Sequence, residues 1–210
     1  MAVSVSVGMA AMATMVAGKV MAGPEDIAFP QGFEKWQMYQ QLNRHDVKQY
    51  RELYAKPEVV KAVREGKPIP NGAVLVIAIF AAQEGVDSKP PRNAKGNFIK
   101  GKPTLVTVME RRAGWGNFVP AEWRYGDWQY AAYFPDGTPN EKANAGIKAC
   151  FECHLPHAKQ DFVISLAGLA GTAGGAVQRP SGPGTVAIAE FLFGPEKVNV
   201  KADRKSTRLN

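Results

Sequence analysis

Apolar residues form two kinds of strand pattern in the middle of the chain. Residues 74–80 are a continuous run of apolar and β-branched side chains, as expected for a strand buried on both faces. Residues 104–111 alternate instead: Leu105, Thr107 and Met109 alternate with Val106, Val108 and Glu110. Residues 49–54 and 128–134 also have strand composition.

Turn and helix signals separate these strands. Residues 57–64 form a predicted helix, with Pro57 in its first turn and Gly66 just past its end. Gly126-Asp127 predicts a hairpin turn between strands 123–125 and 128–134, residues 84–102 a long loop, and residues 140–150 a helix. The predicted fold is α+β and β-dominant: an antiparallel sheet with flanking helices, in a single domain.

The two ends differ from this middle part. Residues 1–22 resemble a secretory signal, with an apolar stretch and a small-x-small pattern at residues 20–22. Residues 165–184 are rich in glycine and proline and predict a linker. The expected organisation is therefore a signal-like segment (1–22), a main domain (23–164), a linker (165–184) and a short final segment (185–210). The mature chain is expected to be periplasmic or otherwise exported, with no membrane span.

The formal net charge of +7 does not change this picture. Lys19 and the last ten residues together carry four of the seven charges, which leaves +3 for residues 23–200. The remaining basic residues are scattered along the chain and are not interleaved with aromatic ones, so nucleic acid is not an expected partner.

The strongest chemical signal is Cys150-Phe151-Glu152-Cys153-His154, a Cys-x-x-Cys-His sequence. In this c-type haem attachment pattern the two cysteines form thioethers to the haem and the histidine binds the iron. These are the only two cysteines in the chain, so a four-cysteine zinc site is excluded. A thioredoxin-like redox pair is the remaining alternative, but no βαβ unit surrounds the motif. One covalent haem c is the expected cofactor.

The sixth iron ligand is left open by the sequence. No methionine follows His154, so the candidates are Met38, Met109, His45 or a lysine. His157 is too close to His154 in sequence to reach the opposite side of a haem with ease. We expect an open distal site, which binds small ligands, whereas a filled one only passes electrons.

Several motifs in this order resemble the cytochrome P-460 family. They are Pro70-Asn71-Gly72-Ala73-Val74, Met109-Glu110-Arg111 with Gly114-Trp115-Gly116, Tyr133-Phe134-Pro135-Asp136-Gly137, and Cys150 to His154 with Asp161-Phe162-Val163. The resemblance covers residues 33–163. It implies a β-rich fold, a homodimer, one c-type haem with an open distal side, and oxidation of hydroxylamine with nitric oxide species as intermediates.

One position departs from that pattern. The hydroxylamine oxidisers of the family cross-link a strand lysine to the haem, and the matching position here is Ile77. The relatives without the cross-link, the cytochrome c-prime-beta group, bind nitric oxide and carbon monoxide beneath an apolar cap. Candidate distal residues here are Phe80, Glu110, Trp115 and Tyr133. Arg111 and Arg112 are candidates to pair with haem propionates.

Residues 186–202 resemble the first two strands of a cupredoxin, a blue-copper domain. None of that family's copper ligands follows, since no histidine or cysteine comes after His157 and no methionine after Met109, so no copper is expected in this chain. The sequence thus favours an exported haem protein that converts hydroxylamine or nitric oxide and passes electrons to a copper or haem protein. The alternatives are a gas-binding cytochrome without turnover and a simple electron carrier.

Overall fold

The computed structural model describes residues 23–123 and 126–172. The expectations for residues 1–22 and 173–210, which include the signal-like and cupredoxin-like segments, lie outside the described residues. Among the residues described, no helix is both long and apolar enough to cross a bilayer.

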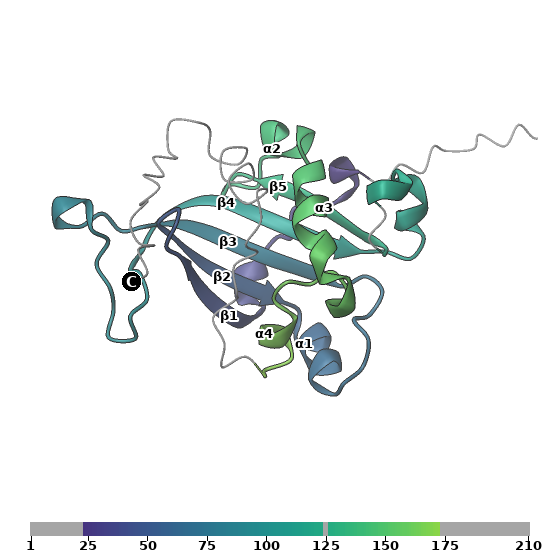
Figure 1. The fold of residues 1–210 in the computed structure, drawn as a ribbon, viewed down its shortest axis with the longest axis horizontal. Coiled ribbons are helices and arrows are strands. Elements are labelled where there is room, and N and C mark those ends of the chain that lie inside the picture. The colour runs from purple at the N-terminus through teal and green to yellow at the C-terminus, as the bar shows by residue number, and fades with distance from the viewer. Residues whose placement is uncertain (1–22, 124–125, 173–210) are drawn as a thin grey trace, which may run out of the picture.

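One antiparallel sheet of five strands forms the centre of the molecule, and its strands lie side by side in chain order (Figure 1). The strands are β1 (Gln37–Arg44), β2 (Gln49–Ala55), β3 (Val74–Ala82), β4 (Lys100–Arg111) and β5 (Trp128–Tyr133). The α-helices are α1 (Pro57–Arg64), α2 (Glu141–Ala145), α3 (Lys148–His154) and α4 (Leu166–Leu169). Short 3₁₀ helices are η1 (Pro24–Asp26), η2 (Phe33–Lys35), η3 (Val86–Ser88), η4 (Trp115–Phe118), η5 (Ala121–Trp123) and η6 (Leu155–Gln160). This confirms the predicted α+β, β-dominant class.

The sheet has two faces, because side chains alternate along each strand. Ala55, Leu75, Met109 and Tyr130 are neighbours in register and point to the face that α3 covers, here called the α3 face. Tyr54, Val76, Val108 and Ala131 form the next row and point the other way, to the outer face. The N-terminal segment closes the outer face with Ile27 and Phe33.

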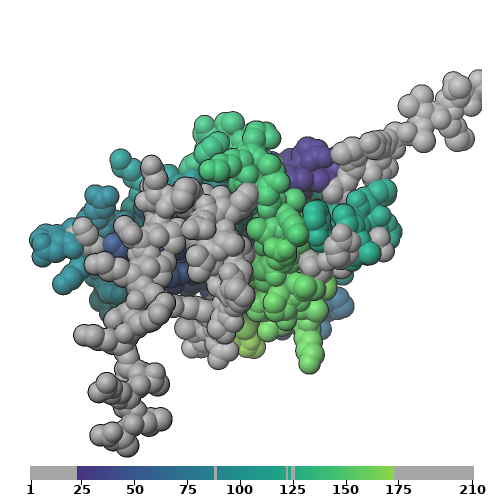
Figure 2. Space-filling model, turned by 45° about the horizontal axis from the view of Figure 1, so that its top comes forward, coloured from purple at the N-terminus to yellow at the C-terminus, as the bar shows by residue number. Residues whose placement is uncertain are grey.

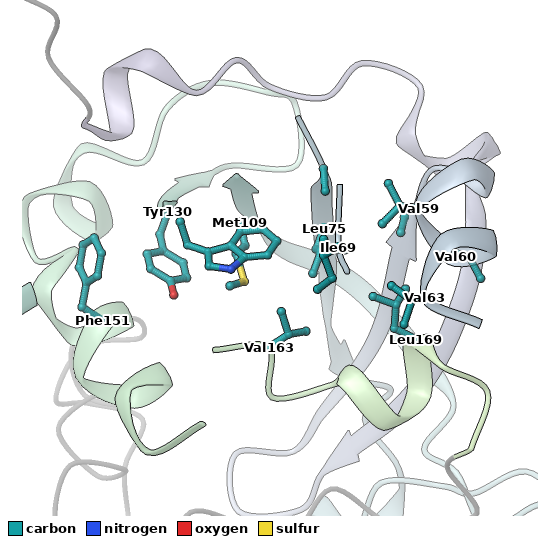
Figure 3. Close-up of a cluster of buried hydrophobic side chains, with 13 residues drawn as sticks. Val59, Val60, Val63, Ile69, Leu75, Met109, Tyr130, Phe151, Val163 and Leu169 are labelled. Atoms are coloured by element: carbon teal, nitrogen blue, oxygen red, sulfur yellow. The ribbon is translucent and has the colours of Figure 1, made fainter. Parts of the chain in front are cut away.

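The cluster on the α3 face joins the helices to the sheet (Figure 3). Phe151 of α3 packs edge-on against Tyr130, with ring centroids 4.9 Å apart. Val59, Val60 and Val63 of α1 belong to the same cluster, and Val63 lies beside Leu169 of α4. Complete burial of Leu169 shows that the folded part continues past residue 164, where the sequence predicted a linker.

The structure corrects two element predictions. The hairpin predicted between strands 123–125 and 128–134 is wrong at Trp123, because Trp123 lies in η5. Among the named strands, β5 pairs only with β4. The indole of Trp123 stacks on the ring of Phe151. This contact joins residues that are distant in sequence, so strand propensity does not predict it. The helix predicted for 140–150 is two helices, α2 and α3, which meet at Gly146.

Candidate haem-binding site

The Cys-x-x-Cys-His motif lies on the last turns of α3. Cys150 and Cys153 are three residues apart and His154 is four from Cys150, so all three lie on one side of the helix. Both cysteines are free thiols. Figure 2 shows the green segment that contains α3 as a ridge beside the teal segment of η4 and η5.

The two thiols do not have the electrostatics of a redox-active pair. Burial, and secondly the charge of Cys153, raises the pKa of Cys150 to about 12. Burial also raises the pKa of Cys153. Reactive Cys-x-x-Cys pairs have lowered pKa values, so this site does not fit the thioredoxin-like alternative. No group of three or more His, Cys, Asp or Glu side chains among the described residues is arranged to hold a metal ion.

His154 is held in one orientation by its neighbours. Its Nδ1–H donates to the carbonyl oxygen of Phe162 at 2.6 Å, and its ring lies 4.9 Å from that of Tyr130. Because Nδ1 carries the proton, Nε2 keeps its lone pair. Burial lowers the pKa of His154 to about 4, so the imidazole is neutral at physiological pH. A neutral imidazole with one nitrogen bonded to a carbonyl is the usual metal-ligating form.

The turn that supplies this carbonyl has an unusual backbone. Asp161 and Phe162 both have positive φ, at 51° and 60°. Non-glycine residues in this region cost about 1–3 kcal/mol each and persist only where surrounding contacts hold them. Arg111 supplies one such contact, because its Nη1 donates to Asp161 Oδ2 at 2.6 Å.

An arginine on the α3 face lies near the motif. Arg51 of β2 is aligned with Ile79 and Leu105, and its positive charge lowers the pKa of Cys153 against the larger effect of burial. Its guanidinium donates to Gln49 Oε1 at 3.1 and 2.7 Å, and the negative charge of Asp46 raises its pKa against the larger effect of burial. Burial lowers the pKa of Arg51 to about 10, so the side chain stays charged at neutral pH.

Apolar side chains lie beside Arg51 along this face. Ile77 lies between Leu53 and Thr107 in the next row, and it points to the same side as Leu75 and Met109. The position that matches the cross-link lysine therefore does face the α3 side, and an isoleucine occupies it.

The four distal candidates from the sequence lie on the outer face, opposite to the face that α3 covers. Trp115, Tyr133 and Phe80 pack in the outer-face cluster, and the Tyr133 hydroxyl donates to the Ile27 carbonyl. Glu110 is also on that face, where it pairs with Arg112 at 2.6 Å. Period-two alternation separates the two faces within one strand, but it does not show which face receives α3.

The structure also shows where three of the candidate sixth ligands lie. Met38 pairs with Tyr54 across β1 and β2 and so points to the outer face. His45 Nδ1 lies 3.2 Å from Arg92, with its ring against Phe98. Met109 is on the α3 face, but it is buried in the cluster with Tyr130 (Figure 3).

Comparison with known proteins places this site in a family. The family model described as Cytochrome P460 matches residues 30–165, which include all five strands and the motif on α3. The chain belongs to the cytochrome P460 family. A search of curated proteins found no match. Membership in the cytochrome P460 family makes this a haem protein that acts on small nitrogen species such as hydroxylamine.

The residues present fit the haem that the family implies. Two free thiols and the unprotonated His154 Nε2 share one side of α3, and Arg51 is a half-buried cation on the sheet face that α3 covers. His157 Nε2, one turn further on, is buried with no hydrogen-bond partner. Sequence reasoning did not assign Arg51 or Tyr130 to the site, since neither belongs to the Cys-x-x-Cys-His motif, and it used Asp161 and Phe162 only as part of the family resemblance.

Proposed function

We propose that this protein carries one covalent c-type haem, held by Cys150, Cys153 and His154, and binds and converts hydroxylamine or nitric oxide at the iron. The observation that carries the proposal is the bond from His154 Nδ1 to the Phe162 carbonyl. It leaves Nε2 available on the same side of α3 as two free thiols. This is the donor set of a c-type haem with a histidine ligand.

The haem, when bound, supplies an iron that takes a small ligand and exchanges single electrons. The chain's own part is to bind and orient. His154 would hold the iron through Nε2, and the Phe162 carbonyl sets the tautomer and direction of the imidazole. Leu53, Ile77, Ile79 and Leu105 keep the α3 face apolar, which limits water at the site.

Arg51 is proposed to bind a haem propionate. The guanidinium of Arg51 is half-buried and its hydrogen bonds go to the neutral amide of Gln49, so a haem propionate would give it a charged hydrogen-bond partner. In a Cys150→Ser/Cys153→Ser background, Arg51→Leu is therefore expected to raise the Kd for haemin about tenfold or more, because hydrogen bonds to charged groups contribute about 1.5–3 kcal/mol. Titration of the haem-free protein with haemin, followed in the Soret band, measures it.

The matched control is Arg64→Leu, since Arg64 is an exposed residue at the end of α1. It is expected to leave the haemin Kd unchanged. Equal effects of the two variants, or none at Arg51, would remove Arg51 from the proposed site.

A gas-binding role without turnover is the second candidate, and Ile77 favours it. The position that holds the cross-link lysine in hydroxylamine oxidisers carries no amine here, so our proposal includes no cross-link at that position. Steady-state consumption of hydroxylamine with an added electron acceptor separates the two: turnover supports an enzyme, whereas nitric oxide binding without turnover supports the gas-binding cytochrome.

An absorption spectrum tests the shared part of both candidates. Millimolar hydroxylamine or nitric oxide is expected to shift the Soret band of the purified protein, because we propose that no protein side chain fills the sixth position. Met109→Leu is the informative variant, and it is expected to keep both the spectrum and the shift. A low-spin spectrum that Met109→Leu converts to high-spin would instead identify a plain electron carrier.

Three further parts of the proposal rest on sequence and family alone. The signal-like residues 1–22 support export to the periplasm or beyond. The family resemblance supports a homodimer. Redox conversion needs a partner that accepts electrons, and a copper or haem protein fits that role.

A further inference from the structure

The Arg111 side chain contacts three parts of the chain next to the turn that bonds to His154. Its Nη1 donates to Asp161 Oδ2 at 2.6 Å and to the Ile69 carbonyl at 3.1 Å. The guanidinium carbon also lies 5.8 Å from the centre of the Trp128 ring. The pair is partly buried, with 25% of the Arg111 side chain and 35% of the Asp161 side chain exposed. Such a pair is screened less by salt than an exposed one.

Arg111 itself is rigidly placed. It ends β4, where its N–H donates to the Ala73 carbonyl at 2.9 Å and its carbonyl accepts from Gly72 at 2.8 Å. Its side chain therefore projects from the ordered edge between β4 and the start of β3. A side chain that starts from an ordered strand end can hold the turn to which it donates in one position.

The strained partner is the turn after the haem motif. Asp161 and Phe162 are consecutive non-glycine residues with positive φ. Contacts of this turn include the Phe162 N–H, which donates to the His157 carbonyl at 2.9 Å, and Val163, which points into the cluster toward Met109 (Figure 3). The Asp161 side chain gives the turn its ion pair with the sheet.

This turn presents the Phe162 carbonyl to His154 Nδ1 at 2.6 Å. A short bond from Nδ1–H to a carbonyl makes the imidazole more electron-rich at Nε2 and a stronger donor to ferric iron. Any residue that fixes the position of this carbonyl therefore acts on the iron through the histidine.

We propose that Arg111 is a positioning residue that sets the reduction potential of the haem, through its ion pair with Asp161 and the Phe162 carbonyl bond to His154. The ion pair holds the left-handed turn so that the carbonyl stays on Nδ1. From the sequence, Arg111 was a candidate to pair with a haem propionate. The positioning role takes the place of that contact in our proposal, because Nη1 of Arg111 already donates to Asp161 and to the Ile69 carbonyl. The inference rests on haem ligation by His154, a part of the proposed function, and not on the nitrogen substrate.

The test compares Arg111→Gln and Asp161→Asn in the haem-loaded protein. Asn tolerates positive φ, so Asp161→Asn removes the charge without adding backbone strain. Both variants are expected to raise the reduction potential and to lower the iron–histidine stretching frequency of the ferrous, ligand-free protein in resonance Raman spectra. Arg111→Lys keeps the ion pair but not the planar fork, so an intermediate shift is expected.

Arg112→Gln is the matched control. Arg112 is the next residue, carries the same charge and pairs with Glu110 on the outer face, so its loss is expected to change neither the potential nor the stretching frequency. The double variant Arg111→Gln/Asp161→Asn is expected to shift the potential no further than the larger single change, because the two side chains act as one pair.

The outcomes separate this inference from the proposed function. A wild-type protein without a c-type haem spectrum would overturn the proposed function. A wild-type protein with that spectrum, whose potential and stretching frequency stay the same in Arg111→Gln, would overturn the inference alone. A shift in Arg112→Gln equal to that in Arg111→Gln would also overturn it, since general charge would then explain the effect.

Discussion

A Cys150→Ser/Cys153→Ser variant is expected to lose all covalently attached haem. These are the only two cysteines in the chain, and both are free thiols on α3, so no other side chain can form a thioether. Haem staining after denaturing electrophoresis should be lost completely. The pyridine haemochrome of any haem that still binds should change from the c-type to the b-type spectrum, because both vinyl groups are then intact.

The single variant Cys153→Ser controls for damage to the helix. It keeps one thioether through Cys150, so we expect a stained band and an intermediate haemochrome. Serine is close to cysteine in size, and the mutated residue is half-buried, so the fold should survive. Covalent haem retained in the double variant would contradict attachment through this motif.

Phe151→Ala is expected to lower the free energy of unfolding by about 3–5 kcal/mol, the usual loss for a buried phenylalanine. Phe151 is 1% exposed, packs edge-on against Tyr130 and stacks on Trp123. Domains of this kind have about 5–15 kcal/mol of stability in total, so this one change removes a large share. Urea unfolding followed by tryptophan fluorescence measures the difference.

Glu152→Ala is the matched control from the same motif. Glu152 is exposed, and it forms an ion pair with Lys148 at 3.4 Å, one turn earlier in α3. Such pairs contribute about 0.3–0.5 kcal/mol, so the expected loss is within about 0.5 kcal/mol. Similar losses for both variants would show that α3 is not anchored to the sheet through Phe151.

Local sequence signals were sufficient for much of the fold. Helix α1 has the predicted bounds, because Pro57 and Gly66 mark its ends independently of tertiary contacts. Strands β3 and β4 contain the predicted segments, since a long β-branched run and a regular alternation have few other stable conformations. Strand β1 was missed, because its mostly polar composition lacks the apolar alternation of a half-buried strand.

The candidate site residues could be proposed from the sequence where one short motif contains them. Cys150, Cys153 and His154 are adjacent in sequence, and one turn of helix is enough to bring them to one side. The distal candidates had no such local constraint. Phe80, Glu110 and Tyr133 were chosen by residue type, and the strand register placed all three on the outer face.

The sequence by itself therefore determined the attachment motif, the haem family and the β-dominant class. These follow from residues close together in the chain and from local periodicity. Only the tertiary structure decided which face of the sheet α3 covers, and so which side chains lie near His154. It also decided that Arg111 and Asp161, fifty positions apart, form an ion pair at the turn that bonds to His154. Contacts between distant segments depend on how helices pack on the sheet, and neither the motif nor the alternation of residues contains that information.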